Sequence, residues 1–376
     1  MTDIALRALR GDNPLHLLAS LGALSLSDGQ TPRAATLRWV RSEGRFTPIV
    51  ATPCAHDAWV ASIADAIQGS ARLGSADVGG ASSETKAAKA RLKKLAEELK
   101  TARQKAKAEA KAKGLNRAET DAWIASQTER LNDDYNQQSG VVRDAEGRQA
   151  QQLGVGPAHL GDIIGVDVAV FRLHASEALQ RYPEDALTVR QLAALGSDGC
   201  TEDNKINPTP LSFSNGGSGK CLLKDYRALA ELCTEAKLHE VLDDRVKVVN
   251  ATSLSWDPRD LRSAAYQWSD PKSQAVEADA VANALAYLGL GALPCFPGER
   301  GLSMVGFFAS RTQGNALEWP LWDGALTLSE VTSLFNARPS TWRRQERLAR
   351  GVFEVMRADI INPTGKRNYF STARAI

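Results

Sequence analysis

A single stretch of this chain, residues 86–117, concentrates positive charge in a pattern that also predicts a helix. It contains twelve Lys and Arg against three Glu, a net charge of +9, whereas the whole chain of 376 residues carries +2. Clustered positive charge is the electrostatic mark of a surface that binds a polyanion, and nucleic acid is the first candidate. Small and apolar residues recur in alternating steps of four and three, at Ala88, Leu92, Leu95, Leu99, Ala102 and Ala106. This spacing predicts the seam of a helix that packs against a second helix.

The second helix is expected directly after the first. Gly114 is typical of a helix end, and Asn116 with Glu119 resembles a capping box. This capping box would start a helix that continues to Tyr135. At about 1.5 Å per residue the first helix would extend roughly 40 Å. We therefore expect an antiparallel helical hairpin.

Several lysines of the first helix lie outside the apolar seam. They are candidate nucleic-acid contacts: Lys93, Lys100, Lys107 and Lys111. The alternative is a solvated surface helix whose lysines only provide solubility, because long runs of charge are often just that.

The hairpin is expected to be an insertion in one globular body. Small residues fill 69–83, and residues 142–156 are polar and punctuated by glycine. We expect residues 1–69 and 157–376 to form a mixed α+β body, with residues 70–156 as the inserted basic helical hairpin. A hydrophobic content of 43% supports a substantial core at this length.

Apolar periodicity and turn signals predict the elements of the body. The predicted helices cover residues 15–26, 55–67, 219–233, 275–288 and 328–335. The predicted strands cover residues 4–9, 37–40, 46–50, 303–309 and 352–361. No regular βαβ repeat is present, so an α+β fold is favoured over a parallel α/β fold.

Composition argues against a membrane protein and against a disulfide framework. No apolar run approaches the roughly 18 residues that span a bilayer, and the N-terminus lacks the pattern of a signal peptide. The five cysteines are odd in number and scattered, as expected for reduced thiols. We expect a cytoplasmic protein with no membrane partner.

The glycine-rich segment 214–221 superficially suggests a phosphate loop of a nucleotide-hydrolysing enzyme. Ser214 stands where that motif requires its first glycine, and Cys221 stands where it requires the Ser or Thr that holds magnesium. A glycine-rich turn before a helix can still hold a nucleic-acid phosphate, which makes Asn215 and Lys220 candidate contacts. A flexible turn with a helix cap is the open alternative.

Other catalytic patterns are incomplete. Cys54 and His56 have no second Cys or His pair at metal-ligand spacing, and His16 lies inside an apolar helix, where a core histidine is expected. No tight carboxylate cluster resembles a two-metal nuclease centre. The sequence therefore predicts a protein that is not an enzyme, with no metal and no cofactor.

Arginines cluster near the C-terminal end around Trp342. The candidate contacts there are Arg343 and Arg344, because arginine beside an aromatic ring suits both stacking on bases and pairing with phosphates. A solvated helix start is the alternative.

The closing segment 362–370 reads as a turn that carries two cations and two aromatic residues. Lys366, Arg367 and Asn368 are candidate nucleic-acid contacts at the tip of a β-hairpin. The aromatic residues of this turn are equally compatible with the core.

An ordered set of segments resembles subunits of type I CRISPR effector complexes, and most closely the large-subunit-like proteins of the I-G subtype, formerly I-U. The segments are ALRGDNPLHLLASLGALSL, TLRWV, GRFTPIV, TPLSFSNGGSGKCLL, LSWDPRDLRSAAYQW, ADAVANALAYLGLGALPCFP and RGVFEVMRADIINPTGKRNYFSTARAI. The resemblance spans most of residues 1–70 and 190–376, and the Lys-rich hairpin has no counterpart in it.

This resemblance implies a non-catalytic subunit of a crRNA-guided surveillance complex. Such a subunit lies near the 5′ end of the guide, helps recognise the short motif beside the target, and recruits the helicase-nuclease. The implied partners are crRNA, target DNA, the backbone subunits and the helicase-nuclease. The resemblance implies candidate contact residues at two places only. These are Asn215 and Lys220 in the glycine-rich turn, and Lys366, Arg367 and Asn368 in the closing turn.

Two other function classes stay open. A scaffold or adaptor would use the hairpin as a coiled-coil arm for a protein partner and would not bind nucleic acid. An enzyme that acts on nucleic acid through metal ligands outside the known patterns would respond to magnesium or manganese.

Overall fold

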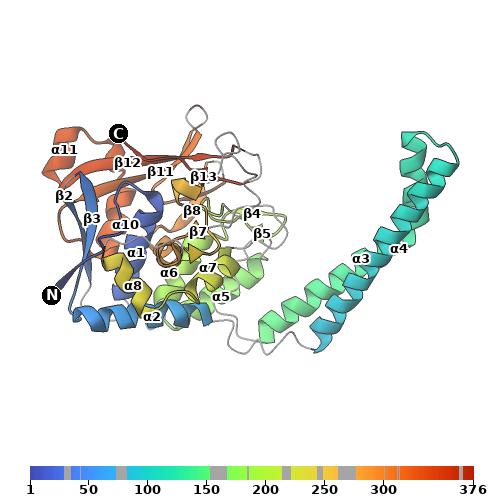
Figure 1. Ribbon diagram of the computed structural model, residues 1–376, viewed down its shortest axis with the longest axis horizontal. Helices are drawn as coiled ribbons and strands as arrows, with labels where there is room; N and C mark the ends of the chain where they lie inside the picture. The colour runs from blue at the N-terminus through green and yellow to red at the C-terminus, as the bar shows by residue number, and fades with distance from the viewer. Residues whose placement is uncertain are drawn as a thin grey trace. The chain divides into compact units, whose positions relative to one another are not determined.

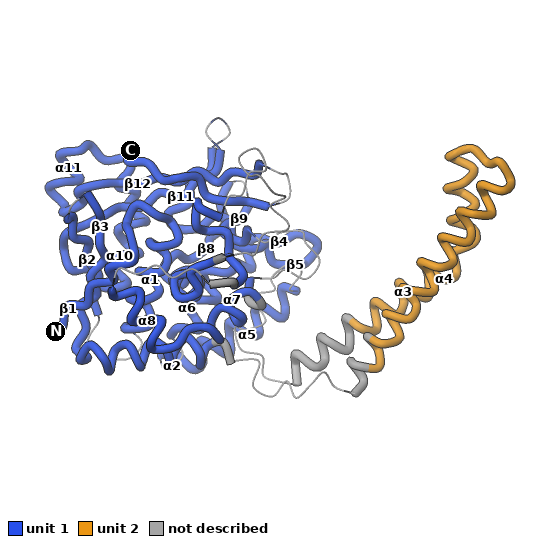
Figure 2. The backbone as a smooth tube through the Cα atoms, viewed as in Figure 1, with its two compact units in different colours: residues 1–73, 156–376 blue, residues 74–155 orange. Residues whose placement is uncertain are grey.

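The computed structural model divides the chain into two compact units, residues 1–73 with 156–376 and residues 74–155 (Figure 2). The structure describes residues 1–28, 35–42, 44–72, 83–152, 167–183, 186–213, 222–243, 249–260, 277–299, 301–310, 312, 314–363 and 367–376. Helices and several small sheets mix in the first unit, and two helices form the second. The expected mixed α+β fold with an inserted antiparallel helical hairpin is confirmed.

Among the described residues, two sheets have more than two strands; both are antiparallel and belong to the first unit. The smaller has the order β1–β3–β2, with β1 at Thr2–Ala5, β2 at Thr36–Ser42 and β3 at Arg45–Thr52. The larger has the order β10–β11–β12–β13, with β14 also paired to β12. Its strands are β10 at Phe307–Ser310, β11 at Gly314–Trp322, β12 at Val352–Ile361, β13 at Tyr369–Phe370 and β14 at Arg374–Ala375.

Tryptophans join the two sheets. The indole N–H of Trp322 donates to the carbonyl of Leu37 at 2.8 Å, and Leu37 also pairs with Leu326 in an isolated bridge. The ring of Trp39 meets that of Trp322 edge to face, with centroids 6.1 Å apart. Both rings are buried, so their packed surfaces stabilise this junction together with the hydrogen bond of the Trp322 indole.

The centre of this unit is α1, Pro14–Asp28, which Figure 1 shows enclosed by strands and helices. All of its residues from 14 to 27 are buried, as expected for a helix that is apolar on every side. It packs against α9, Ala280–Gly289, which is also buried throughout. A Cβ added to Gly22 would lie 1.9 Å from the carbonyl oxygen of Leu285, and one added to Gly289 would lie 1.9 Å from that of Leu18. The two backbones therefore meet where only glycine fits.

The other helices of the unit surround this pair. They are α2 at His56–Arg72, α5 at Val168–Gln180, α6 at Ala186–Leu195, α7 at Leu222–Ala230, α8 at Glu235–Leu242, α10 at Leu328–Asn336 and α11 at Arg344–Ala349. The short strand pairs are β4 at Thr201–Glu202 with β5 at Lys205–Ile206, β6 at Val249–Asn250 with β7 at Glu277–Ala278, and β8 at Cys295–Gly298 with β9 at Gly301–Met304.

The second unit is the hairpin of α3, Ser83–Ala112, and α4, Arg117–Gln152. The predicted seam is confirmed, since Ala88, Leu99 and Ala106 are 7%, 7% and 2% exposed. The predicted capping box is confirmed as well, because Asn116 and Glu119 exchange backbone-to-side-chain hydrogen bonds of 2.9 and 3.0 Å.

The second helix of the hairpin is longer than the sequence predicted, since the prediction followed it only to Tyr135 and described residues 142–156 as polar and punctuated by glycine. Helix α4 continues to Gln152, because the seam continues beyond Tyr135: Gln138 donates to the carbonyl of Ala88 at 3.2 Å, and Val142 is 7% exposed. The glycines and the polarity of this stretch hid the helix, which its partner helix stabilises.

Other boundaries differ from the prediction as well; the strand expected over residues 4–9, for example, is β1, which ends at Ala5. The single strand expected over 303–309 is two strands of different sheets, β9 and β10, separated at Gly306, whose φ is +78°. Helix α9 begins at residue 280 and not at 275, since Asp279 caps it by accepting from the backbone N–H of Ala282 at 2.9 Å.

We predict that Gly22→Ala lowers the free energy of unfolding by about 3 kcal/mol or more, because the added methyl group meets a backbone oxygen that cannot move without separating α1 from α9. Urea denaturation measures the change. The control is Gly69→Ala in α2, where nothing lies within 4 Å of the new methyl group, and this variant should gain about 0.5–1 kcal/mol. Equal stability of the Gly22 variant and the parent would contradict the close helix crossing.

Candidate nucleic-acid interface

The basic residues of the hairpin lie on the exposed side of α3. The four lysines that the sequence singled out are all exposed: Lys93, Lys100, Lys107 and Lys111. The apolar seam faces α4, so these lysines take no part in the packing of the two helices.

The two helices of the hairpin carry opposite charge. Helix α3 contains ten Lys and Arg against four Glu, whereas α4 contains four Arg against seven Asp and Glu. The exposed acids of α4 include Asp121, Glu129, Asp133 and Asp134. A polyanion is therefore attracted to the α3 side of the hairpin.

Three of the sequence candidates, Asn215, Lys220 and Lys366, lie outside the described residues. The residues that flank their two turns are described, and these flanks meet. Phe213 comes just before the glycine-rich turn, and Phe370 comes at the end of the closing turn. The centroids of their rings are 4.9 Å apart. Both rings are fully buried. The structure thus brings together the residues that flank two turns, and these turns are about 150 residues apart in the sequence.

A third segment, residues 253–260, joins the same place. The indole N–H of Trp256 donates to the carbonyl of Leu211 at 2.9 Å, beside Phe213. The guanidinium of Arg367 donates to the carbonyl of Ser253 at 2.7 Å. Segment 253–260 therefore lies between the residues that flank the two turns.

The strands on either side of the closing turn pair antiparallel, because β12 pairs with β13 through Ile360 and Phe370. The residues of this turn contribute in different ways. Arg367 is half-buried and bonded to Ser253, so at least one of its N–H groups is committed to the fold. Asn368 is also half-buried, and Phe370 belongs to the core.

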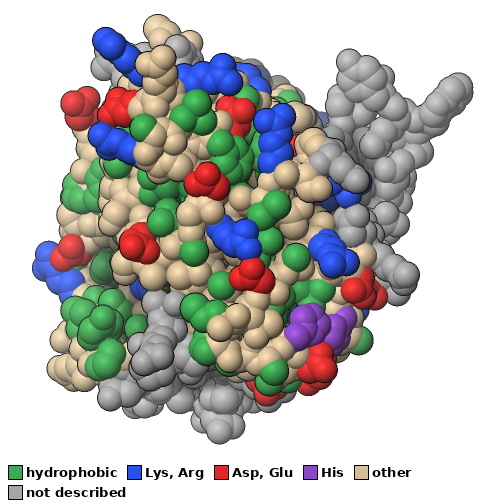
Figure 3. Space-filling view, turned by 90° about the vertical axis from the view of Figure 1, so that its left-hand side faces the viewer, with side chains coloured by type: hydrophobic (Ala, Val, Ile, Leu, Met, Phe, Trp, Pro, Cys, Tyr) green, Lys and Arg blue, Asp and Glu red, His purple; other side chains and the backbone are tan. Residues whose placement is uncertain are grey.

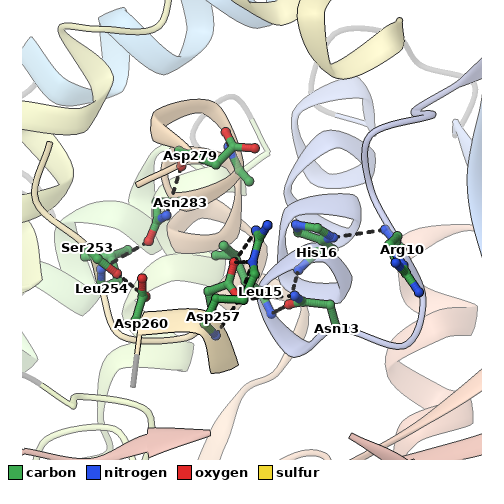
Figure 4. A network of polar contacts seen from close by, with 12 residues as sticks. Arg10, Asn13, Leu15, His16, Ser253, Leu254, Asp257, Asp260, Asp279 and Asn283 are labelled. Atoms are coloured by element: carbon green, nitrogen blue, oxygen red, sulfur yellow. Dashed lines mark hydrogen bonds and ion pairs between the residues drawn. The ribbon is translucent and has the colours of Figure 1, made fainter. Parts of the chain in front are cut away.

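A polar network fixes segment 253–260 to the starts of α1 and α9 (Figure 4). Arg259 holds the carboxylate of Asp257 with several hydrogen bonds of 2.9 to 3.0 Å, and the Asn13 amide reaches Asp257 at 3.4 Å. On the α9 side, the side-chain amide oxygen of Asn283 accepts a hydrogen bond from the backbone N–H of Leu254 at 3.1 Å. The segment is thereby held from two helices at once.

Burial sets the protonation of this network. Burial lowers the pKa of His16 to about 4, so its ring is neutral, and its Nδ1 accepts the backbone N–H of Arg10 at 3.1 Å. Burial opposes ionisation of Asp257, but the hydrogen bonds and charge of Arg259 outweigh it and lower the pKa of Asp257. Burial raises the pKa of Asp260 to about 6, although the Ser253 hydroxyl donates to its carboxylate. His16 is therefore a core histidine, as the sequence predicted.

Sequence reasoning did not find this network. Its members come from residues 10–16, 253–260 and 279–283, so no local pattern joins them. The signal was present as the motif LSWDPRD, which the resemblance quotes without a role for its Asp and Arg residues.

Some arginines of the cluster after α10 have bonding partners among the described residues, and others do not. Arg347 donates to the carbonyl of Ile376 at 2.7 Å. Arg350 pairs with Glu346 at 2.9 Å and lies over the Trp342 ring at 4.4 Å.

Arg343 and Arg344 are exposed at the start of α11, and no partner for them is found within the described part of the chain. On the face in Figure 3, Lys and Arg side chains are most frequent along the upper edge, at the height where Figure 1 places α11. Positive and negative side chains alternate over the rest of that face.

A scan against protein-family models, a search of curated proteins and a search of solved structures each find no match to this chain. The resemblance to large-subunit-like proteins of type I-G complexes therefore stays a prediction that rests on the quoted segments. Among the residues that the structure describes, no helix has both the length and the apolarity to cross a bilayer. Within the same residues, no three His, Cys, Asp or Glu side chains are grouped as a metal site requires.

We predict that Asp260→Asn stabilises the protein at neutral pH by about 1–3 kcal/mol. The folded pKa of Asp260, about 6, lies above its unfolded value, so stability falls as pH rises between about 4 and 6. Asparagine removes this penalty and still accepts from the Ser253 hydroxyl. Urea denaturation at several pH values measures it, and the gain should vanish below about pH 4.

Asp260→Ala is the control, because it removes the acceptor for Ser253 as well as the charge. A loss of stability in the Asn variant at neutral pH would mean that attraction to Arg367 outweighs burial, contrary to this account.

Proposed function

We propose that this chain is a non-catalytic nucleic-acid-binding subunit of a crRNA-guided type I CRISPR surveillance complex. It helps recognise the motif beside the target and holds target DNA. Its partners are crRNA, target DNA, the backbone subunits and the helicase-nuclease, and it works in the cytoplasm without a cofactor.

The observation that carries the proposal is the contact between the described residues that flank the glycine-rich turn and the closing turn. The resemblance marks these two turns as candidate contacts, and their flanks touch through Phe213 and Phe370. Helix α7 begins directly after the glycine-rich turn, so its first backbone N–H groups point towards that side. Backbone amides at a helix start suit a phosphate group.

The hairpin adds a second surface of the same chemistry. In guided effectors, base pairing reads the sequence, and the protein holds duplex and single strand through backbone contacts. A row of exposed lysines on α3 suits that task, since each contact to a phosphate releases a counterion and no base is read.

An adaptor remains the second candidate, because the hairpin has a coiled-coil-like seam and an acidic α4 side that a basic protein surface would match. In that case the arm would bind protein, and the lysines would serve solubility.

Purification from the native host is the direct test of the proposed complex. We expect a short repeat-derived RNA and a multi-copy backbone subunit to co-purify with the chain. Co-purification of proteins alone, without RNA, would contradict the proposal and favour the adaptor.

We predict that changing Lys93, Lys100, Lys107 and Lys111 to Glu weakens nucleic-acid binding and flattens the slope of log affinity against log salt by about three to four units, if each lysine meets one phosphate. Fluorescence anisotropy over a salt series measures the slope. The packing of α3 on α4 should survive, because all four side chains are exposed.

A matched control separates position from net charge. Lys107→Glu on α3 is compared with Arg130→Glu on α4, where the replaced residue is also exposed. Only the α3 variant should lower the slope. An unchanged slope in the fourfold α3 variant would remove the arm from the nucleic-acid interface and place the adaptor first.

A further inference from the structure

A pocket of about 70 Å³ opens beside the start of the arginine cluster, at Arg338. Its lining residues come mainly from β8, β10, β11 and the segment that follows α10. Four phenylalanine side chains line it, and three of them, Phe296, Phe307 and Phe308, are not fully buried. Polar groups at the same pocket include Asn336 and Arg338, both exposed.

The rings differ in what already covers them. The guanidinium of Arg357 lies over the Phe308 ring at 4.8 Å from its centroid. Phe296 is 38% exposed and belongs to the short strand β8. An exposed aromatic ring at a polar pocket offers a flat face to another ring, so Phe296 is the platform on which a planar ligand group would stack.

Arg338 is held at the pocket in a backbone conformation that side chains rarely adopt. Its φ is +50°, in the left-handed region. The backbone around it fixes this conformation, because the N–H of Arg338 donates to Phe335 at 3.1 Å and its carbonyl accepts from Thr341 at 2.9 Å. Strained residues of this kind gather at functional sites, where the surroundings enforce them.

The positive charge next to the pocket is uncompensated within the described part of the chain. No carboxylate among those residues pairs with Arg338, and the same holds for Arg343 and Arg344, which follow within a few residues. The acid that lines the pocket, Glu318, is already paired with Arg357 at 2.8 Å. One guanidinium at an aromatic pocket, unpaired within the described residues, with two more a few residues further along the chain, matches a ligand that alternates planar rings and phosphates.

We propose that this pocket binds one unpaired base of a single-stranded nucleic acid, stacked on Phe296, with the flanking phosphates at Arg338, Arg343 and Arg344. The pocket volume is about half of the roughly 150 Å³ that encloses benzene, so the base enters by its edge and stays partly outside. The Asn336 amide is available to that edge. This inference rests on the proposed function, because it assumes nucleic-acid binding, and it specifies single strand as the form held here.

Photo-crosslinking tests the position of the base. A single-stranded oligonucleotide that carries one 5-iodouracil is irradiated with the purified full chain, and the crosslinked peptide is identified by mass spectrometry. The crosslink is expected on the peptide that contains Phe296. A crosslink confined to peptides that do not line the pocket would overturn the proposal.

Two variants test the contribution of the ring and of the arginine. Phe296→Leu keeps an apolar side chain but removes the ring, and Arg338→Gly removes the guanidinium while glycine relieves the positive φ. Each should weaken single-strand binding about ten-fold and leave duplex binding unchanged. The controls are Phe353→Leu, a half-buried ring that packs on Phe46 outside the pocket, and Arg7→Gly, an exposed arginine elsewhere.

The outcomes distinguish this inference from the function on which it rests. If the unaltered chain binds neither single strand nor duplex, the proposed function fails and the pocket assignment fails with it. If the chain binds nucleic acid but Phe296→Leu leaves single-strand affinity unchanged, only the pocket assignment is wrong, and a peptide side chain becomes its occupant. Equal losses for single strand and duplex would also overturn it, because they would indicate phosphate contacts without base stacking.

Discussion

The contact between Gly22 and Gly289 brings α1 and α9 so close that a carbonyl oxygen of each helix occupies the place of a side chain on the other. The rest of the first unit depends on this approach. Helix α1 comes from the first tenth of the sequence and α9 from its last third, so their contact unites the two ends of the chain. The polar network begins at the N-terminal ends of the same helices, with Asn13 and His16 on one side and Asn283 on the other. A change in the spacing of α1 and α9 would therefore move segment 253–260, and with it the residues that flank both turns.

Local patterns made part of the fold predictable from the sequence. The seam of α3, the stop at Gly114 and the strand Val352–Ile361 each follow from residues within one or two turns or along one strand. Strand β11 was not predicted, and it contains Pro320, a residue that is rare in interior strands. In the structure β10 pairs only with the part of β11 up to Leu317, so the missing N–H of Pro320 lies beyond that ladder.

The candidate site was predictable only as separate pieces. The sequence marked the lysines of α3, Arg343 with Arg344, and the closing turn, since each is a local concentration of charge. It did not show that Arg367 bonds to Ser253, because the two residues are more than a hundred positions apart. The polar network was hidden for the same reason, and burial of Asp260 has no local signature. Long-range pairing is specified by the fold as a whole, and short motifs record only one side of it.

The opposite charges of α3 and α4 give the arm a property that depends on the surrounding solution. Two packed helices place their outer faces about 20 Å apart, since each helix with its side chains is roughly 10–12 Å across. At physiological salt, electrostatic forces decay over about 8 Å, so a strand lying on α3 hardly senses the acids of α4. At 0.01 M salt the decay length is about 30 Å, and those acids would then repel the same strand. At physiological salt, a polyanion on α3 therefore interacts with the charges of α3 alone, whereas in dilute buffer it interacts with the charges of both helices. Lowering the salt concentration would by itself make the preference of a polyanion for one side of the hairpin less distinct.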